Sequence, residues 1–148
     1  MALAAGIRRA ETALRHAVEV PTAALVLVEI AVLLAGVVSR FVFHHPFVWS
    51  DELASILFLW LAMLGAVVAL ERTQHMRLTA IAAALPPAWR ARAEVLGVAV
   101  PALFLAIVLP WAIYYAQQEI FIETPALGLS DVVRAGAIPV GCAVMLAW

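Results

Sequence analysis

The chain has 148 residues, of which 66% are hydrophobic and 13% charged, and its formal net charge is −1. Soluble domains are about 45–50% apolar and about 25% charged, so this composition argues against a soluble domain. The small net charge also argues against a nucleic-acid partner. The sequence contains no lysine, which excludes a phosphate-binding loop of the GxxxxGK type, and its single cysteine excludes an internal disulfide.

Long runs without charge predict an all-α membrane protein with four transmembrane helices, forming a single membrane domain over residues 1–148. The first run covers residues 20–39 and is interrupted only by Glu29. A helix of that length extends for about 30 Å, the thickness of the hydrocarbon layer. No small-residue cleavage site follows, so we interpret this run as a retained signal-anchor helix. The second run, 53–70, begins after Ser50, which can cap a helix.

The third and fourth runs are less regular. The third covers residues 95–116 and contains Pro101 and Pro110, each of which is expected to loosen or kink the helix. The fourth is expected over residues 130–148, where the part free of charge, 135–148, is about 21 Å long. That length is short for a complete crossing, so we expect the fourth helix to be truncated in this sequence.

Between the second and third runs, apolar residues recur at helical spacing before two consecutive prolines. These residues are Met76, Leu78, Ile81 and Leu85, followed by Pro86 and Pro87. The pattern predicts either a short helix lying in the membrane interface, with Trp89 as an anchor, or a loop packed on the bundle.

The arginines divide unevenly between the two sides of such a chain. Seven of them lie in residues 1–19 and 71–94, whereas only Arg40 and Arg134 fall on the opposite side. The positive-inside rule therefore places the N-terminus and the second loop in the cytoplasm and the other two loops in the periplasm. We accordingly expect a multi-pass protein of the bacterial inner membrane.

The segment from Arg40 to Leu53 gathers one arginine, two histidines, two carboxylates and four aromatic residues at the outer end of the first span. One interpretation is an aromatic belt followed by a capped helix start. The other is a docking surface, in which Arg40 pairs with Asp51 or Glu52 and the aromatic side chains face a partner.

Glu29 lies near the centre of the first span, where an unpaired carboxylate costs several kcal/mol. No arginine lies inside the other spans, so two interpretations stay open: a protonated carboxyl that is hydrogen-bonded within the bundle, or a carboxyl that faces a second subunit. No histidine lies inside a span, so we expect neither a haem nor a metal site. Two stripes of small residues, Ala31–Ala35–Ser39 and Ala62–Ala66, predict close helix packing.

The stretch from residue 40 to residue 77 resembles the small membrane subunit (Q-type, DctQ-like) of tripartite ATP-independent periplasmic (TRAP) transporters. The matching pattern is Arg40-Phe-Val-Phe, Pro46, Trp49-Ser-Asp-Glu-Leu-Ala, Phe58-Leu-Trp60, Gly65-Ala66, Arg72 and His75-Met-Arg77. A second patch, Thr124-Pro-Ala-Leu-Gly128 followed by Ile138-Pro-Val-Gly141, is similar to the end region of the same family. The sequence departs from the family pattern at Gly36, Ser55 and Thr79.

The resemblance implies a scaffold subunit that braces a large multi-span subunit, either separate or fused. That partner would carry the sodium and substrate sites, and a soluble periplasmic binding protein would deliver an organic acid to it. No cofactor is implied for this chain itself. The candidates for contacts with the partner subunit or the binding protein are Arg40, Trp49, Asp51, Glu52, Trp60, Arg72, His75 and Arg77.

Two other functions stay open at this point. The chain could be a haem-binding anchor subunit of a membrane oxidoreductase, although its histidines lie outside the spans. It could also be a self-contained channel or exporter in which Glu29 lines the pathway. The sequence shows no catalytic constellation, so we do not expect an enzyme.

Overall fold

The computed structural model describes the backbone of residues 2–84 and 86–147, and the side chains of residues 16–70, 86, 89, 92–93 and 95–147. The backbone forms helices α1 (Ala2–Phe41), α2 (Val48–Ala84), α3 (Pro87–Gln118), α4 (Val132–Ala135) and α5 (Ala137–Ala147), with a 3₁₀ turn η1 (Glu119–Phe121) after α3. The predicted all-α class is confirmed in this part of the chain.

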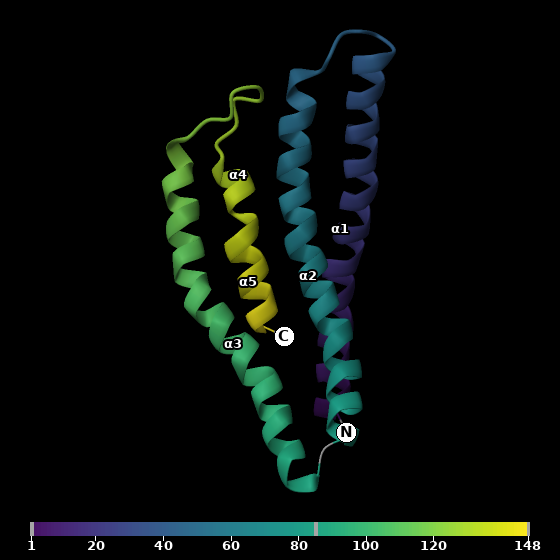
Figure 1. Ribbon diagram of the computed structural model, residues 1–148, viewed down its shortest axis with the longest axis vertical. Coiled ribbons are helices and arrows are strands. Elements are labelled where there is room, and N and C mark those ends of the chain that lie inside the picture. The colour runs from purple at the N-terminus through teal and green to yellow at the C-terminus, as the bar shows by residue number, and fades with distance from the viewer. Residues whose placement is uncertain (1, 85, 148) are drawn as a thin grey trace.

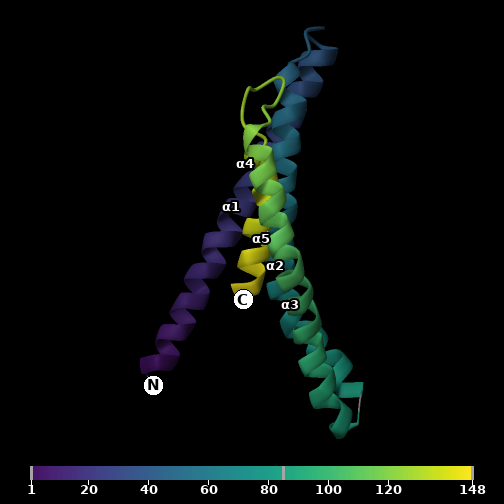
Figure 2. The ribbon, with the colours of Figure 1, turned by 90° about the vertical axis from the view of Figure 1, so that its left-hand side faces the viewer.

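Two antiparallel hairpins build the bundle (Figure 1). The first hairpin pairs α1 with α2, and the second pairs α3 with α4 and α5. In the described part of the chain α1 packs against α2, whereas α2 also packs against α3, α4 and α5. Figure 2 shows that the N-terminal half of α1 diverges from the other helices. Helix α2 is therefore the element that joins the two hairpins.

Among the residues that the structure describes, three helical segments are long and apolar enough to cross a membrane: His16–Phe41, Val48–Leu70 and Val95–Phe121. The three spans predicted from the sequence lie inside these segments. In the apolar 18-residue stretch of each helix, only 11%, 17% and 6% of the residues, respectively, are buried by the chain itself. Most of the apolar surface of each span is therefore left for lipid or for another protein.

The fourth apolar segment, Val132–Ala147, is shorter and is broken into α4 and α5 at Gly136. A physical reason is Pro139, which has no N–H to donate to the carbonyl of Ala135, the residue four positions earlier. The expected place of the fourth helix is thus confirmed, but not its continuity. Helix α3, in contrast, continues through both Pro101 and Pro110, and Figure 1 shows its axis changing direction along its length.

The expectation of a separate interfacial helix, or of a packed loop, before Pro86 was wrong. Residues 71–84 continue α2 without a break, so that one helix of 37 residues runs from Val48 to Ala84. No glycine or proline interrupts the sequence between Gly65 and Pro86, and the helix ends where proline disfavours a helical residue before it. Arg72, His75 and Arg77 lie on this extension, and their side chains fall outside the described residues.

The core is thin and consists mainly of small residues. Its buried hydrophobic members are Ala54, Ile56, Val67, Ala112, Ala116, Ala135, Ala137 and Cys142. Of the predicted stripes of small residues, Ser39 is buried, whereas Ala31, Ala35, Ala62 and Ala66 are exposed, so these alanines do not pack between the helices of this chain. Helix α1 turns Glu29 and Ser39 inward, and a Cβ atom on Gly36 would lie 3.0 Å from Ser50 Oγ of α2.

Candidate functional site

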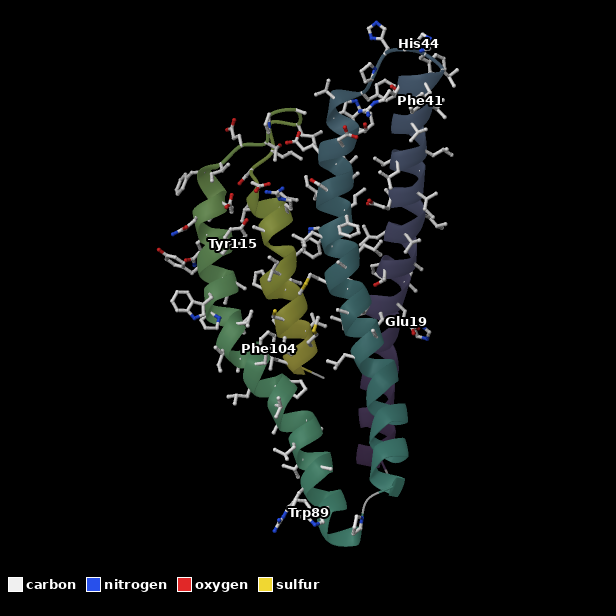
Figure 3. The ribbon with its side chains drawn as sticks, in the orientation of Figure 1. Glu19, Phe41, His44, Trp89, Phe104 and Tyr115 are labelled. Atoms are coloured by element: carbon white, nitrogen blue, oxygen red, sulfur yellow. The ribbon has the colours of Figure 1, made fainter. Side chains whose placement is uncertain are left out.

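The residues with the richest polar contacts gather at one end of the bundle. Here the α1–α2 connection (residues 42–47) and the α3–α4 connection (residues 119–131) both turn back toward the bundle (Figure 1). We call this the loop end. Phe41 and His44 lie there in Figure 3, whereas Trp89 lies at the opposite end, where the guanidinium of Arg92 sits 5.4 Å from its ring centroid.

Ser39 shapes the α1–α2 connection. Only 1% of its surface is exposed, and its hydroxyl donates to the carbonyl of His45 and accepts from the backbone N–H of Phe47 at 3.1 Å. Ser50 completes the turn, because its hydroxyl donates to the carbonyl of Phe47 at 2.7 Å. The turn also holds His44 at a positive φ of 54°, a region that residues other than glycine adopt uncommonly. Side-chain hydroxyls therefore replace backbone partners in this connection.

Replacing Ser39 by alanine should destabilise the α1–α2 hairpin by about 1–2 kcal/mol, because the carbonyl of His45 and the N–H of Phe47 both lose the buried Ser39 hydroxyl as a partner. Thermal unfolding of the purified chain in detergent checks this. Ser55→Ala is the matched control, since the Ser55 hydroxyl is exposed and donates only to the nearby carbonyl of Glu52. Equal unfolding temperatures for the two variants would contradict the role given to Ser39.

Arg40 and Asp51 form the ion pair that closes this connection. The Arg40 Nη2 and Asp51 Oδ2 atoms are 3.3 Å apart, and the two side chains are 60% and 77% exposed. Of the two partners expected for Arg40, Asp51 is therefore the one observed. Next to the pair, Phe47 and Trp49 stack with ring centroids 5.5 Å apart, and both remain exposed.

Glu52 instead reaches the second hairpin. Its Oε2 atom accepts backbone N–H groups of Ala126 at 2.9 Å and Leu127 at 2.8 Å, residues 74 and 75 positions further along the chain. Hydrogen bonds to a charged acceptor are about twice as strong as neutral ones. The Glu52 carboxylate thus fastens α2 to the α3–α4 connection.

The segment that Glu52 holds is a tight turn from Thr124 to Gly128. The N–H of Gly128 donates to the carbonyl of Thr124, and the N–H of Leu129 donates to the Thr124 hydroxyl. Gly128 has a φ of 62°, which glycine adopts without the strain that a side chain brings. The Thr124-Pro-Ala-Leu-Gly128 motif therefore encodes a turn that presents two adjacent N–H groups to α2.

A second contact that joins α2 to the second hairpin lies about two helical turns further along α2. The indole N–H of Trp60 donates to the carbonyl of Val133 at 2.8 Å. This carbonyl belongs to the last turn of α4, where carbonyls lack partners within the helix. In the same helix, Arg134 pairs with the carboxylate of Asp131, which is buried.

These contacts sort the residues proposed from the sequence. Arg40 and Asp51 contact each other, Glu52 and Trp60 contact the second hairpin, and Trp49 stacks on Phe47. All five of these residues lie in the half of the bundle nearer the loop end. Arg72, His75 and Arg77 lie instead on the extension of α2 beyond residue 70.

Glu29 is separate from the loop end. It is 8% exposed, so it does not lie on the outer surface of the chain, where a second subunit would reach it. Among the described residues, no donor lies within hydrogen-bonding distance of its Oε2 atom. The expectation of burial within the bundle agrees with this position, but the hydrogen bond expected of the carboxyl is not observed at Oε2.

Reasoning from the sequence named Ser39 only as a small residue of a stripe and Thr124 only as part of a motif, and it did not name Asp131; the contacts of all three at the loop end were missed. A signal existed for Thr124, because threonine and proline followed by glycine are typical of a tight turn. No local signal marked Ser39 as a polar clamp, since its partners depend on how the chain leaves α1.

Comparisons with known proteins identify the family of the chain. The chain matches the family described as "Tripartite ATP-independent periplasmic transporters, DctQ component" over residues 29–148. It is 30% identical over 125 residues to the sialic acid TRAP transporter small permease protein SiaQ of Vibrio cholerae. This match covers 83% of this chain and 71% of that protein.

A shorter match connects the chain with a larger protein. Over 45 residues, 30% of this chain, it is 47% identical to the sialic acid TRAP transporter permease protein SiaT of Haemophilus influenzae, of which the match covers 7%. The alternative of a haem-binding anchor subunit finds no support in these matches. The chain belongs to the family of DctQ components and is a small membrane subunit of a TRAP transporter.

Proposed function

We propose that the chain is the brace of a sodium-driven importer of an organic acid. The large membrane subunit would bind sodium and substrate, and a periplasmic binding protein would deliver the acid. The names of the relatives support this class of substrate, since both specify sialic acid, which is an organic acid. This chain itself would bind no cofactor and catalyse no reaction.

The observation that carries the proposal is the fastening of the two hairpins to each other. Glu52 and Trp60, both on α2, contact the second hairpin, so hydrogen bonds within the chain hold its shape at the loop end. The spans bury little of their own apolar surface, which supports a role as a surface for a partner. A brace needs both properties: a defined shape and a large outward face.

The proposed orientation places the loop end in the periplasm and the N-terminus in the cytoplasm of a cell with an inner membrane. The N-terminal end of α1 and the junction of α2 and α3 lie at the same end of the bundle (Figures 1 and 2). Seven of the nine arginines belong to these two parts of the sequence, as the positive-inside rule requires of a cytoplasmic side.

Co-purification tests the proposal. A tagged chain, extracted in mild detergent from cells that also produce the large subunit and the binding protein, should retain the large subunit. Uptake of an organic acid into proteoliposomes should then need this chain, the large subunit, the binding protein and a sodium gradient. Uptake by the large subunit and the binding protein alone would contradict the brace.

Trp49 is the candidate contact residue that we assign to the partner. It is 40% exposed and is ordered by stacking on Phe47, and ordered exposed tryptophans often dominate interfaces. Trp49→Ala should weaken retention of the large subunit about tenfold or more while leaving the thermal stability of the chain nearly unchanged. Trp49→Phe, which keeps an aromatic face, should retain most of the binding. Wild-type retention by Trp49→Ala would remove Trp49 from the interface.

A further inference from the structure

A groove of about 100 Å³ lies between α1 and α2 near the loop end. Its apolar part is formed by Val32, Leu33, Gly36 and Val37 of α1, and Arg40 and Asp51 lie at one end of it. The hydrogen bonds by which Glu52 and Trp60 join the two hairpins involve none of these residues. The groove is therefore a surface of its own, distinct from the Glu52 turn.

Gly36 lines the groove and lets its two helices approach closely. A Cβ atom at this position would lie 3.0 Å from Ser50 Oγ, so the Ser50 side chain already occupies the space on that side of Gly36. Leu33 and Val37 are both about half exposed beside it. In a membrane, an apolar hollow in a helix surface is filled by acyl chains or by another apolar surface, because water is absent there.

The charged end of the groove lies at the depth of lipid head groups. Arg40 belongs to the last turn of α1 and Asp51 to the first turn of α2, and the corresponding spans end at Phe41 and begin at Val48. The hydrocarbon layer ends where such spans end, and head groups begin there.

The ion pair leaves most of its hydrogen-bonding capacity unused. One N–H group of Arg40 meets one oxygen of Asp51 at 3.3 Å, and among the described side chains neither group makes a second hydrogen bond or ion pair. A guanidinium has five N–H donors and a carboxylate has two acceptor oxygens. The charged end therefore offers both a cation and an anion to a ligand of matching charges.

A head group with a phosphate and a primary ammonium matches this arrangement. The phosphate can accept from Arg40, which is suited to bidentate contacts with phosphate, and the ammonium can donate to Asp51. A phosphatidylglycerol head group carries only the negative charge and would face Asp51 unfavourably. The quaternary ammonium of phosphatidylcholine has no N–H to donate to the carboxylate.

We propose that the groove between α1 and α2 binds one phosphatidylethanolamine molecule, with an acyl chain along Gly36 and the head group on Arg40 and Asp51. The site depends on neither the orientation of the chain nor the transported substrate. Its failure would therefore leave the proposed brace function standing.

Native mass spectrometry tests the site. The full chain, purified in mild detergent together with any large subunit that stays bound, is mixed with equal amounts of phosphatidylethanolamine, phosphatidylglycerol and phosphatidylcholine. Retention of phosphatidylethanolamine should exceed that of each other lipid at least threefold. Asp51→Asn should reverse the preference toward phosphatidylglycerol, because Arg40 then stands alone, and Arg40→Gln should lower retention of all three lipids.

Arg134→Gln is the matched control, because Arg134 also lies at the loop end but pairs with Asp131 outside the groove. This variant should keep the preference of the wild type. Equal retention of the three lipids by the wild type, or an unchanged preference in Asp51→Asn, would overturn the proposal. So would a complex with the large subunit that carries no lipid while the chain alone does, because protein would then occupy the groove.

Discussion

Glu52→Ala should detach the α3–α4 connection from α2 and lower uptake by the reconstituted three-component transporter at least tenfold. The substitution removes the acceptor of two adjacent N–H groups, those of Ala126 and Leu127. A hydrogen bond to a charged group contributes about 1.5–3 kcal/mol, and Glu52 is only half-buried, so we expect a loss of about 3 kcal/mol in the free energy of unfolding. Hydrogen exchange at these two amides gives a direct reading, because both should exchange faster.

Two further substitutions serve as controls for this prediction. Glu52→Gln keeps an oxygen that can accept from both amides and loses only the charge, so its effects should be clearly smaller than those of alanine. Glu123→Ala removes an exposed glutamate from the same connection and should change the unfolding free energy by less than about 0.5 kcal/mol. If the Ala126 and Leu127 amides exchange at the same rate in Glu52→Ala and in the wild type, Glu52 does not hold the turn.

The spans were predictable because, in a membrane, a long uncharged stretch of sequence is by itself enough to indicate a helix. A run of about twenty residues without charge has few alternatives to a transmembrane helix, and the three runs found in the sequence lie inside the three apolar helices. The length of α2 was harder to predict. Its extension, residues 71–84, contains no glycine or proline, and only the proline pair at 86–87 marks its end. The predicted span ended at residue 70 because Glu71 is the first charged residue after the apolar run, but the helix itself continues to Ala84.

Local pairs at the loop end were also predictable, whereas distant ones were not. Arg40 and Asp51 stand on either side of one short connection, so their pairing was one of two alternatives that the sequence offered. Glu52 is the neighbour of Asp51, and a helix turns successive side chains about 100° apart, so the two carboxylates point to different partners. Which partner Glu52 meets depends on how the second hairpin packs, and nothing in the sequence around residue 52 carries that information.

The faces of the helices were the least predictable feature. Alanines are frequent on every side of α1 and α2, so their spacing did not distinguish the packed face from the exposed one. Glycines did mark the closest approaches: Gly36 against Ser50, and Gly141 against Met63. Glycine without a Cβ atom permits a contact that alanine at the same position would block, so its presence is informative where alanine is common.

Gly141→Ala should therefore destabilise the packing of α5 against α2, although a single added methyl group is the smallest possible change. The new Cβ atom would lie 2.6 Å from Cε and 2.9 Å from Cβ of Met63. The Cε atom can move away, but the Cβ atom is fixed to the backbone of α2, so the helices must separate. Overpacking of this kind costs about 1–3 kcal/mol, which thermal unfolding of the purified chain should show.

Gly65→Ala is the matched control, because Gly65 is also a helical glycine of the bundle but nothing lies within 4 Å of the Cβ atom that it would gain. This variant should be neutral or more stable, since alanine is the better helix former by about 0.5–1 kcal/mol. In the Gly141→Ala background, Met63→Ala should restore only part of the lost stability, because it removes Cε and Cγ but keeps Cβ at 2.9 Å. Met63→Gly should relieve the clash further. If Gly141→Ala and Gly65→Ala are equally stable, the close approach of α5 to α2 at Met63 does not hold in the membrane protein.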